Sequence, residues 1–355
     1  MDGQRVKPAP EAIRRARETY PELRERDLAR KLGVSEADYV AAYCGISAVR
    51  IEPRAPEIMD GLNAVGEVMA LTRNESAVHE KIGVYENRLG EGEGAFAMLG
   101  SEINLRVFPP LWAHGFAVEK PGKDGPRRSL QFFDAAGEAV HKVHLRPASD
   151  LGAYDALIGR LGSGDQSPGI ETRVVPTRET GDLAMAQARR DELRQRWQEM
   201  TDIHQYHGLL VDFALTRHQA VRIAGDDLAW PLAPAGVAEM MGQAVAAALP
   251  IMCFVGSRGC IQIHAGPIAG TKEMGPWLNV LDETFHLHLR TDQIAETWAV
   301  RKPVAEGHVT SIEAYDAAGS LVIQFFGLRE RGRDERGDWR ALVERLPRLQ
   351  QPDAA

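Results

Sequence analysis

Two histidines three residues apart are the first candidates for chemistry in this sequence. His204 and His207 lie in the segment Thr201-Asp-Ile-His-Gln-Tyr-His-Gly-Leu-Leu210. Thr201 or Asp202 suits an N-cap, which predicts a helix with His204 in its first turn and both imidazoles on one face. The positive helix N-terminus disfavours the imidazolium, and a neutral imidazole is the form that ligates a metal. The spacing therefore indicates a metal-binding face, although surface or helix-capping histidines have the same spacing.

Arg106 and Phe108 form the second candidate. They lie in a segment that alternates apolar residues with others, Ile103, Leu105 and Val107 against Asn104, Arg106 and Phe108. This period of two predicts a strand with Arg106 and Phe108 on one face. A cation beside an aromatic ring suits an anionic planar ligand, or oxygen bound to a metal. An exposed strand face with a snorkelling arginine accounts for the same pattern.

Further cations and histidines lie in the second half of the chain. The cations that could neutralise ligand carboxylates are Arg217, Arg258, Lys302 and Arg329. Each of them could equally be a solvated surface charge. His286 and His288 share a predicted strand face, but no third ligand stands in a suitable motif nearby. These residues need a scaffold that brings them together.

An internal repeat shows how that scaffold is organised. A shift of 182 residues aligns the chain with itself without a gap: Ala117-Val-Glu-Lys120 on Ala299-Val-Arg-Lys302, Asp134-Ala-Ala-Gly137 on Asp316-Ala-Ala-Gly319, and Leu99 and Leu105 on Leu281 and Leu287. A constant offset through separate segments indicates a duplication. Position 22 is the counterpart of His204, and it is occupied by Glu22. Only the second copy therefore has the candidate ligand.

Each copy is predicted to contain a helical part followed by antiparallel strands. The helical parts cover roughly residues 10–66 and 183–249, and the two Asp-Ala-Ala-Gly sequences predict hairpin turns. The fold class is therefore α+β, a tandem duplication in which each half has helices and a large antiparallel sheet. We expect a first repeat at 1–160, a linker at 161–182, a second repeat at 183–345 and a disordered tail at 346–355.

Composition limits the class of protein. The hydrophobic content of 44% and the charged content of 26% are ordinary for a globular protein, and the net charge of −8 argues against a mainly nucleic-acid-binding protein. No signal peptide is visible and no run of about 18 apolar residues occurs, so we expect no membrane insertion. The three scattered cysteines do not form a disulfide framework. Together these features predict a cytoplasmic protein.

The segment from Asp27 to Tyr39 has the pattern of a helix-turn-helix, with Gly33 in the turn and Ser35 as the second N-cap. A DNA-reading helix should present basic or amide side chains to the bases. Here its start is acidic, with Glu36 and Asp38, and acidic residues repel phosphate. DNA binding is therefore the weakest of the functions considered.

The chain resembles the HemS/HmuS family of cytoplasmic haemin-degrading and haem-trafficking proteins, which are encoded with bacterial haem-uptake systems. The resemblance covers roughly residues 10–345. Its anchors are Gly66–Lys81, Ile103–Pro109, Asp202–His204, Thr216–Gln219, Gly256–Gly259, Arg301–Pro303 and Gln324–Gly327. The tandem architecture of the family agrees with the repeat.

The resemblance implies a role for each candidate residue. His204 would be the proximal ligand of haem b, bound as substrate or cargo, and His207 an alternative ligand. Arg106 would face the iron from the first half as the catalytic residue, with Phe108 packed on the macrocycle. Arg217, Arg258, Lys302 and Arg329 would meet propionates or line a pocket between the His204 helix and the second sheet. His79 is the candidate for a second haem in the first half.

Two functions then remain open. The first is an enzyme that opens the haem ring and releases iron, because Arg106 could donate hydrogen bonds to oxygen at the iron. The second is a carrier that delivers haem to a separate haem oxygenase, because His207 would allow ligand exchange. The sequence has no G-x-G-x-x-G fingerprint between a strand and a helix, so electrons would come from an external donor. The cytoplasmic face of a haem ABC transporter is a further expected partner, and a haem-linked DNA-binding regulator is the third function.

Overall fold

A computed structural model describes residues 7–90, 94–175, 185–329 and 332–349. The chain divides into two compact units. Unit 1 comprises residues 1–73, 80–176 and 256–262, and unit 2 comprises residues 74–79, 177–255 and 263–355. The boundaries expected from the sequence left segments 74–79 and 256–262 with their own halves, whereas in the structure each segment belongs to the unit of the other half.

The first half of the chain begins with helices and continues with strands, as the sequence predicted, although β1 lies among the helices and α5 follows the strands. They are α1 (Pro10–Thr19), α2 (Glu25–Leu32), α3 (Glu36–Ala41), β1 (Ala48–Ile51), α4 (Ala55–Val65), β2 (Val68–Arg73), β3 (Ala77–Gly83), β4 (Asn87–Leu89), β5 (Phe96–Leu99), β6 (Asn104–Val107), the 3-10 helix η1 (Pro109–Leu111), β7 (His114–Lys120), β8 (Arg127–Phe133), β9 (Ala139–Leu145) and α5 (Leu151–Leu161).

The second half repeats this order element by element. It contains α6 (Gln187–Gln198), α7 (Gln205–Asp212), α8 (Arg217–Ile223), β10 (Ala229–Leu232), α9 (Gly236–Ala246), β11 (Ile251–Gly256), β12 (Cys260–Gly266), β13 (Lys272–Met274), β14 (Trp277–Leu281), β15 (Phe285–Arg290), η2 (Thr291–Gln293), β16 (Glu296–Val304), β17 (Gly307–Tyr315), β18 (Leu321–Gly327) and α10 (Gly337–Arg345). The α+β class and the tandem duplication are confirmed.

The two sheets agree even in their irregularities. In unit 1, β1, β7, β8, β9 and β2 form an antiparallel ladder in that order, and in unit 2 the ladder is β10, β16, β17, β18 and β11. The register shifts at Phe132/Phe133 in unit 1 and at Ala314/Tyr315 in unit 2, which are equivalent positions in the repeat. A shared bulge indicates that the two copies inherited one backbone.

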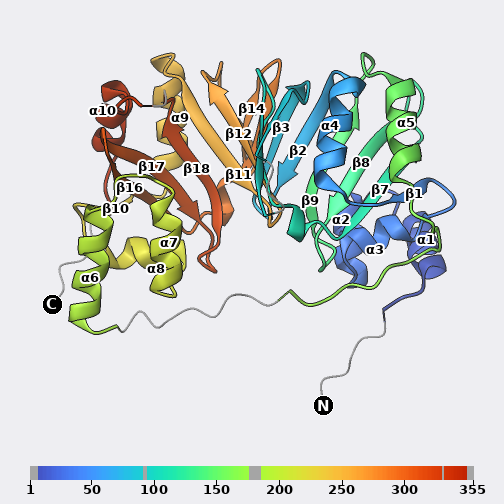
Figure 1. Cartoon of the computed structure of the whole chain (residues 1–355), viewed down its shortest axis with the longest axis horizontal. Coiled ribbons are helices and arrows are strands. Elements are labelled where there is room, and N and C mark those ends of the chain that lie inside the picture. The colour runs from blue at the N-terminus through green and yellow to red at the C-terminus, as the bar shows by residue number, and fades with distance from the viewer. Residues whose placement is uncertain (1–6, 91–93, 176–184, 330–331, 350–355) are drawn as a thin grey trace. The chain divides into compact units, whose positions relative to one another are not determined.

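Helices cover both faces of each ladder, as the alternation of buried side chains shows. In unit 1, Ala117 of β7 packs with α4 and α5, whereas Phe116 and Val118 pack with α1, α2 and α3. In unit 2, Ala299 of β16 packs with α9 and α10, and Val300 packs with α6, α7 and α8. Figure 1 shows α4 and α5 running alongside each other, with α1, α2 and α3 as a separate group. The segment with His204 therefore belongs to the layer formed by α6, α7 and α8.

The predicted hairpin turns are present in both units. Asp134 Oδ1 accepts a hydrogen bond from the backbone N–H of Ala136 at 2.9 Å, and Asp316 Oδ1 accepts one from that of Ala318 at 2.9 Å. Each turn ends in a glycine with positive φ, 81° in the first and 75° in the second. The aspartate and the glycine account for the preference of this sequence for the turn.

The segment Asp27–Tyr39 does have helix-turn-helix geometry. Gly33 ends α2 with φ 69°, and Ser35 and Asp38 form a reciprocal capping box at the start of α3. However, every residue of α3 is buried. A recognition helix must reach the major groove, so the DNA-binding interpretation of this segment is wrong.

The described residues of the expected linker and tail make contacts with the rest of their units. Gln166 donates a hydrogen bond to the carbonyl of Arg50 at 2.9 Å, so part of the linker packs on unit 1. Leu346 is buried, and the backbone N–H of Leu349 donates to the carbonyl of Pro231. The predicted tail from 350 and the linker from 176 lie outside the described residues. Among the described helices, none is long and apolar enough to cross a membrane.

Candidate functional site

The segment that joins α6 to α7 carries His204. Helix α7 begins at Gln205, so His204 occupies the N-cap position and not the first turn. Gln205 Oε1 accepts hydrogen bonds from the backbone N–H groups of Thr201 at 2.8 Å and Asp202 at 3.0 Å. The carbonyl of Thr201 accepts a further bond from the N–H of Ala305 in the β16–β17 hairpin, at 2.9 Å. The segment is therefore held by hydrogen bonds to Gln205 of α7 and to the β16–β17 hairpin. The N-cap is His204 and not Asp202.

Asp202 holds the imidazole of His204 instead. Its Oδ1 lies 2.6 Å from His204 Nδ1 and also accepts the backbone N–H of His204 at 2.7 Å. Because a carboxylate only accepts, this geometry assigns the hydrogen to Nδ1 and leaves the lone pair on Nε2. The side chain of His204 is 90% exposed. Histidines that ligate metals usually donate their other ring N–H to a carboxylate or carbonyl in this way.

The Asp202 carboxyl stays ionised because of its neighbours. Hydrogen bonds from the backbone and the side chain of His204 lower its pKa, and the charge of Arg329 lowers it further. Arg329, one of the predicted ligand cations, thus acts electrostatically on the carboxylate that orients His204. A negative partner at Nδ1 raises the basicity of Nε2 as a ligand.

His207 lies on the exposed surface of α7, three residues after His204. Gly208 next to it is exposed, and a Cβ at this position would meet nothing within 4 Å. The apolar neighbours Leu209 and Leu210 point the other way, into the core below α7. Buried side chains fill the space directly below α7. A pocket beside this helix that the first half closes remains a prediction. The two histidines face outward.

A buried ionic group lies below α7, and we call it the Glu313 cluster (Glu313, Lys302, Arg217, Ser311 and Tyr315). Lys302 Nζ contacts Glu313 Oε1 at 2.5 Å and Ser311 Oγ at 2.8 Å. Tyr315 donates to Glu313 Oε2 at 2.5 Å, and Arg217 Nη1 lies 3.6 Å from Glu313 Oε1. Glu313 and Ser311 have no exposed surface, and Lys302 has 1%.

The cluster holds its charges against a large desolvation cost. Burial would raise the pKa of Glu313, but Lys302 and Arg217 bring it down to about 2. Burial lowers the pKa of Lys302 to about 8, although Glu313 opposes this shift. Burial raises the pKa of Tyr206, and so does the charge of Glu313. Tyr206 belongs to α7, the helix that follows His204. The charge of Glu313 on the sheet therefore acts on a side chain of that helix.

The four predicted cations have different surroundings. Lys302 is buried and paired, so it has no surface for a ligand carboxylate in this structure. Arg217 keeps 30% of its side chain exposed, and its guanidinium also lies over the Tyr206 ring, 5.0 Å from the centroid. Arg258 belongs to unit 1, where it contacts Asp134 Oδ2 at 3.1 Å. Arg217 contacts α7 through Tyr206, and Arg329 lies near Asp202. The predicted ligand roles of all four cations remain predictions.

The predicted strand with Arg106 has the expected alternation. Ile103, Leu105 and Val107 are fully buried, whereas Arg106 is exposed and Phe108 is partly exposed. The hydrogen bond of the Arg106 guanidinium is to the carbonyl of Leu105, at 3.0 Å. Arg106 and Phe108 lie in unit 1. Their predicted roles at a ligand remain predictions.

His79 and His288, two of the other candidate histidines, pack or pair within the fold. His79 is fully buried, belongs to unit 2 and packs against Phe285, with ring centroids 4.9 Å apart. It thus offers no exposed ligand for a second haem in the first half. His288 Nδ1 contacts Asn279 Oδ1 at 2.6 Å within the β14–β15 pair.

Sequence reasoning missed the contacts of two residues near His204 and α7, Asp202 and Glu313. Asp202 was interpreted as a helix cap, although a carboxylate two residues before a histidine can reach both its N–H groups. Glu313 was not considered, because a single acidic residue in a strand usually faces solvent. The repeat could have drawn attention to Glu313. Its counterpart in the first copy is the neutral Gln131, although the serine two residues earlier, Ser129 or Ser311, is the same in both copies.

The fold and site define a class of protein. It is a duplicated α+β protein in which one copy presents an exposed histidine, oriented by a carboxylate as a metal ligand would be. The chain belongs to the family of the haemin-degrading HemS.ChuX domain, whose model matches residues 33–161 and 214–346. The two matches correspond to the two copies, and His204 lies between them.

Characterised relatives and solved structures agree with this family. The chain is 37% identical over 331 residues to the hemin transport protein HmuS of Yersinia pestis, covering 93% of this chain and 95% of the relative. Holo-PhuS, a heme-binding protein from Pseudomonas aeruginosa, has 40% identity and a TM-score of 0.91, over 96% of this chain and 99% of that chain. The heme degrading enzyme ChuS of Escherichia coli O157:H7 has 33% identity and a TM-score of 0.88, over 96% and 100%.

Proposed function

We propose that this protein binds haem through His204 in the cytoplasm and degrades it, releasing iron. The observation that carries the binding proposal is the exposed imidazole of His204 with Nδ1 held by Asp202, which leaves Nε2 as the ligand atom. Family membership supports haem as the metal compound, because relatives with closely similar structures are described as heme-binding or heme-degrading.

The residues around His204 suit an anionic ligand with a metal centre. Asp202 fixes the tautomer and the ring orientation of the ligand histidine. Arg217 and Arg329 carry positive charge near α7, as a ligand with two carboxylates requires. The open surface at Gly208 leaves space beside the backbone for a flat molecule.

Degradation requires more than binding. Bound haem would supply the iron at which dioxygen is reduced with electrons from an external donor. The contribution of this chain would be Arg106, whose guanidinium is exposed and can donate hydrogen bonds where negative charge develops. Phe108, which directly follows this strand, would pack against the macrocycle.

A carrier is the second candidate, and one observation favours it. His207 is exposed on α7, the helix that begins directly after His204. A second imidazole is therefore available for ligand exchange during transfer. A carrier would hand intact haem to a haem oxygenase, and the pair of histidines would determine the rate of transfer.

Binding is tested with haemin and the full-length protein. His204→Ala should lower haem affinity by about 100-fold or more and change the Soret band, because the ligand atom is lost. His286→Ala, a histidine on β15, is the matched control and should leave the spectrum unchanged. If neither His204→Ala nor the His204→Ala/His207→Ala double variant alters the spectrum, the assignment is wrong.

Degradation and transfer are separated by adding reductant in air with catalase present. Loss of the Soret band with stoichiometric iron release supports the enzyme, and the same loss should be largely absent in Arg106→Ala. An unchanged spectrum, together with haem transfer to an apo haem oxygenase that slows in His207→Ala, supports the carrier.

A further inference from the structure

A basic hollow of about 820 Å³ lies on unit 1, between the β7–β8 hairpin and the connection from β9 to α5. Its lining includes four cationic side chains, Lys123, Arg127, Arg128 and Arg146, against one acidic side chain, Asp124. On a protein with a net charge of −8, such a concentration of positive charge is unusual. The hollow is remote in sequence from His204.

The equivalent place in unit 2 is filled by two carboxylates of the chain itself. The connection from β18 to α10 spans residues 328–336, whereas that from β9 to α5 spans only residues 146–150. Within the longer connection, Glu335 is 6% exposed, and both its carboxylate oxygens accept the backbone N–H of Thr310 at 2.9 Å. Asp334 lies so close to Gly307 that a Cβ there would be 2.5 Å from its carboxylate oxygen.

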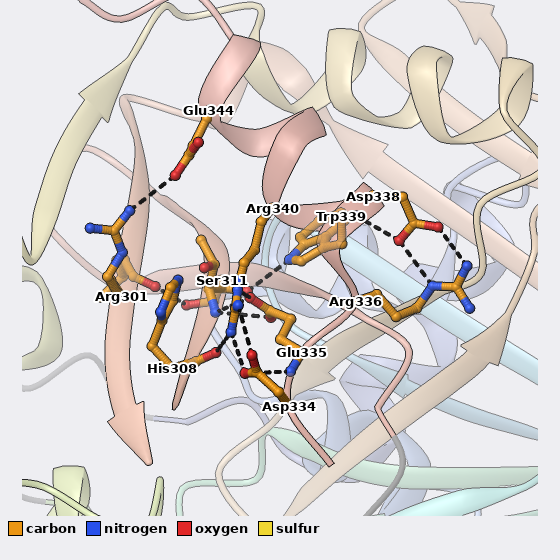
Figure 2. Close-up of polar contacts among 12 residues, drawn as sticks. Arg301, His308, Ser311, Asp334, Glu335, Arg336, Asp338, Trp339, Arg340 and Glu344 are labelled. Atoms are coloured by element: carbon orange, nitrogen blue, oxygen red, sulfur yellow. Dashed lines mark hydrogen bonds and ion pairs between the residues drawn. The ribbon is translucent and has the colours of Figure 1, made fainter. Parts of the chain in front are cut away.

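Figure 2 shows this cluster, with Asp334 and Glu335 gathered around Arg340. Arg340 Nη1 donates to Asp334 Oδ2 at 2.9 Å, and Nη2 donates to the carbonyl of His308 at 2.6 Å. The three hairpin residues that this cluster touches are Gly307, His308 and Thr310. Their repeat counterparts are Gly125, Pro126 and Arg128, and all three line the hollow of unit 1.

The basic residues occur only in the copy that lacks the internal carboxylates. The counterparts of Lys123, Arg127, Arg128 and Arg146 in unit 2 are uncharged, namely Ala305, Val309, Thr310 and Leu328. Unit 2 thus shows which group this backbone accommodates, and unit 1 has the charges to hold such a group from another molecule. The charge pattern and the internal carboxylates are independent observations.

Two of the four cations have intramolecular partners. Arg128 contacts Glu119 at 2.8 Å and Arg146 contacts Glu67 at 2.9 Å, in partly exposed ion pairs. The structure gives no acidic partner to Lys123 or Arg127 among the described residues. A bound anion would therefore gain most of its electrostatic stabilisation from Lys123 and Arg127.

We propose that this hollow binds an acidic segment of a protein partner, with two adjacent carboxylates placed as Asp334 and Glu335 are placed in unit 2. The β7–β8 hairpin and the start of β8 would receive the segment, and Lys123 and Arg127 would neutralise it. A peptide fits better than a single small anion, because the internal counterpart consists of two consecutive acidic residues, Asp334 and Glu335.

The test uses the full-length protein and a fluorescein-labelled Gly-Asp-Glu-Gly peptide, with binding followed by fluorescence anisotropy at low ionic strength. Lys123→Ala/Arg127→Ala should weaken binding by about tenfold, because two charge-assisted contacts are lost. Arg15→Ala/Arg24→Ala removes the same charge from exposed positions of unit 1 outside the hollow and should leave binding nearly unchanged. Gly-Asn-Gln-Gly should not bind.

Each of the other outcomes overturns the proposal. Equal weakening by both double variants would mean non-specific attraction to positive charge. Inorganic phosphate that competes at the concentration of the peptide would mean a site for a single anion. Vesicles of phosphatidylglycerol that bind the protein through Lys123 and Arg127, while the peptide does not bind, would mean a membrane surface.

Discussion

Both units contain a buried acidic side chain in contact with two cations. The acidic residue belongs to the helical layer in unit 1 and to the sheet in unit 2. In unit 1 the acid is on a helix, since Glu36 at the start of α3 contacts Arg73 on β2 and Lys142 on β9, the latter at 2.6 Å. In unit 2 the acid is on the sheet, since Glu313 of β17 contacts Lys302 on β16 and Arg217 at the start of α8. Each unit therefore has one buried carboxylate between two cations, with the acid and a cation exchanged between helix and sheet.

The difference shows what the fold requires and what it leaves free. An ionic link between the helical layer and the sheet is present in both units, so the backbone accommodates either direction. The direction decides the charge of the helical layer. In unit 2 that layer carries Arg217 beside the helix that follows His204, whereas in unit 1 it carries Glu36 and, at the counterpart of His204, Glu22. At these positions, only the layer in unit 2 carries a cation.

The largest effect is expected from removing the buried acid. Glu313→Ala leaves Lys302 buried without its counter-ion, which should cost about 3–5 kcal/mol of the free energy of unfolding. Glu36→Ala should have a similar effect on unit 1. Urea unfolding, monitored separately for the two units where they unfold in two steps, measures both losses. Gln131→Ala, at the neutral counterpart of Glu313, should cost only about 1 kcal/mol, and an equal loss there would contradict the comparison.

A smaller effect is expected from acid. The pKa values of Glu36 and Glu313 are lowered from 4.5 to about 2 in the folded protein, because in each case the two neighbouring cations outweigh burial. The stability from each group is therefore fully present above pH 4.5 and is lost as the pH falls through about 2. Glu36→Gln should flatten this acid dependence for unit 1, and Glu313→Gln for unit 2. If one of the two substitutions leaves the dependence unchanged, the two clusters are not equivalent.

Local patterns in the sequence were enough to predict much of the fold. The alternation around Arg106, the Asp-Ala-Ala-Gly turns and the offset of 182 residues all predicted elements that the structure contains. Charge patterns were less informative, because a buried ion pair joins residues far apart in the sequence. Lys302 was predicted at a ligand for this reason, although its partner is Glu313. Segments 74–79 and 256–262 each belong to the unit of the other half. This assignment depends on long-range packing, which a local sequence pattern does not predict.

A third prediction concerns Asp202, the carboxylate that orients the candidate ligand His204 in unit 2. Asp202→Asn keeps the size of the side chain but removes the negative partner of His204 Nδ1. Haem affinity should fall by about tenfold, the lower end of the effect of losing such a partner. The reduction potential of bound haem should rise, since a less basic imidazole stabilises the oxidised iron less, and spectroelectrochemistry measures this shift. A change in affinity without a change in potential would mean that Asp202 only maintains the loop.

The smallest effect is expected from giving unit 1 the missing histidine. Glu22→His places an imidazole at the counterpart of His204, but Tyr20 stands where unit 2 has Asp202, and Ser35 stands where it has Arg217. The new imidazole would therefore lack both its orienting carboxylate and a nearby cation. Haemin titration should give the same number of bound haems as in the unchanged protein, and Glu22→His should not restore binding to His204→Ala. A second bound haem in Glu22→His would show that an exposed histidine alone is sufficient, and that the charge of the helical layer does not decide which copy binds.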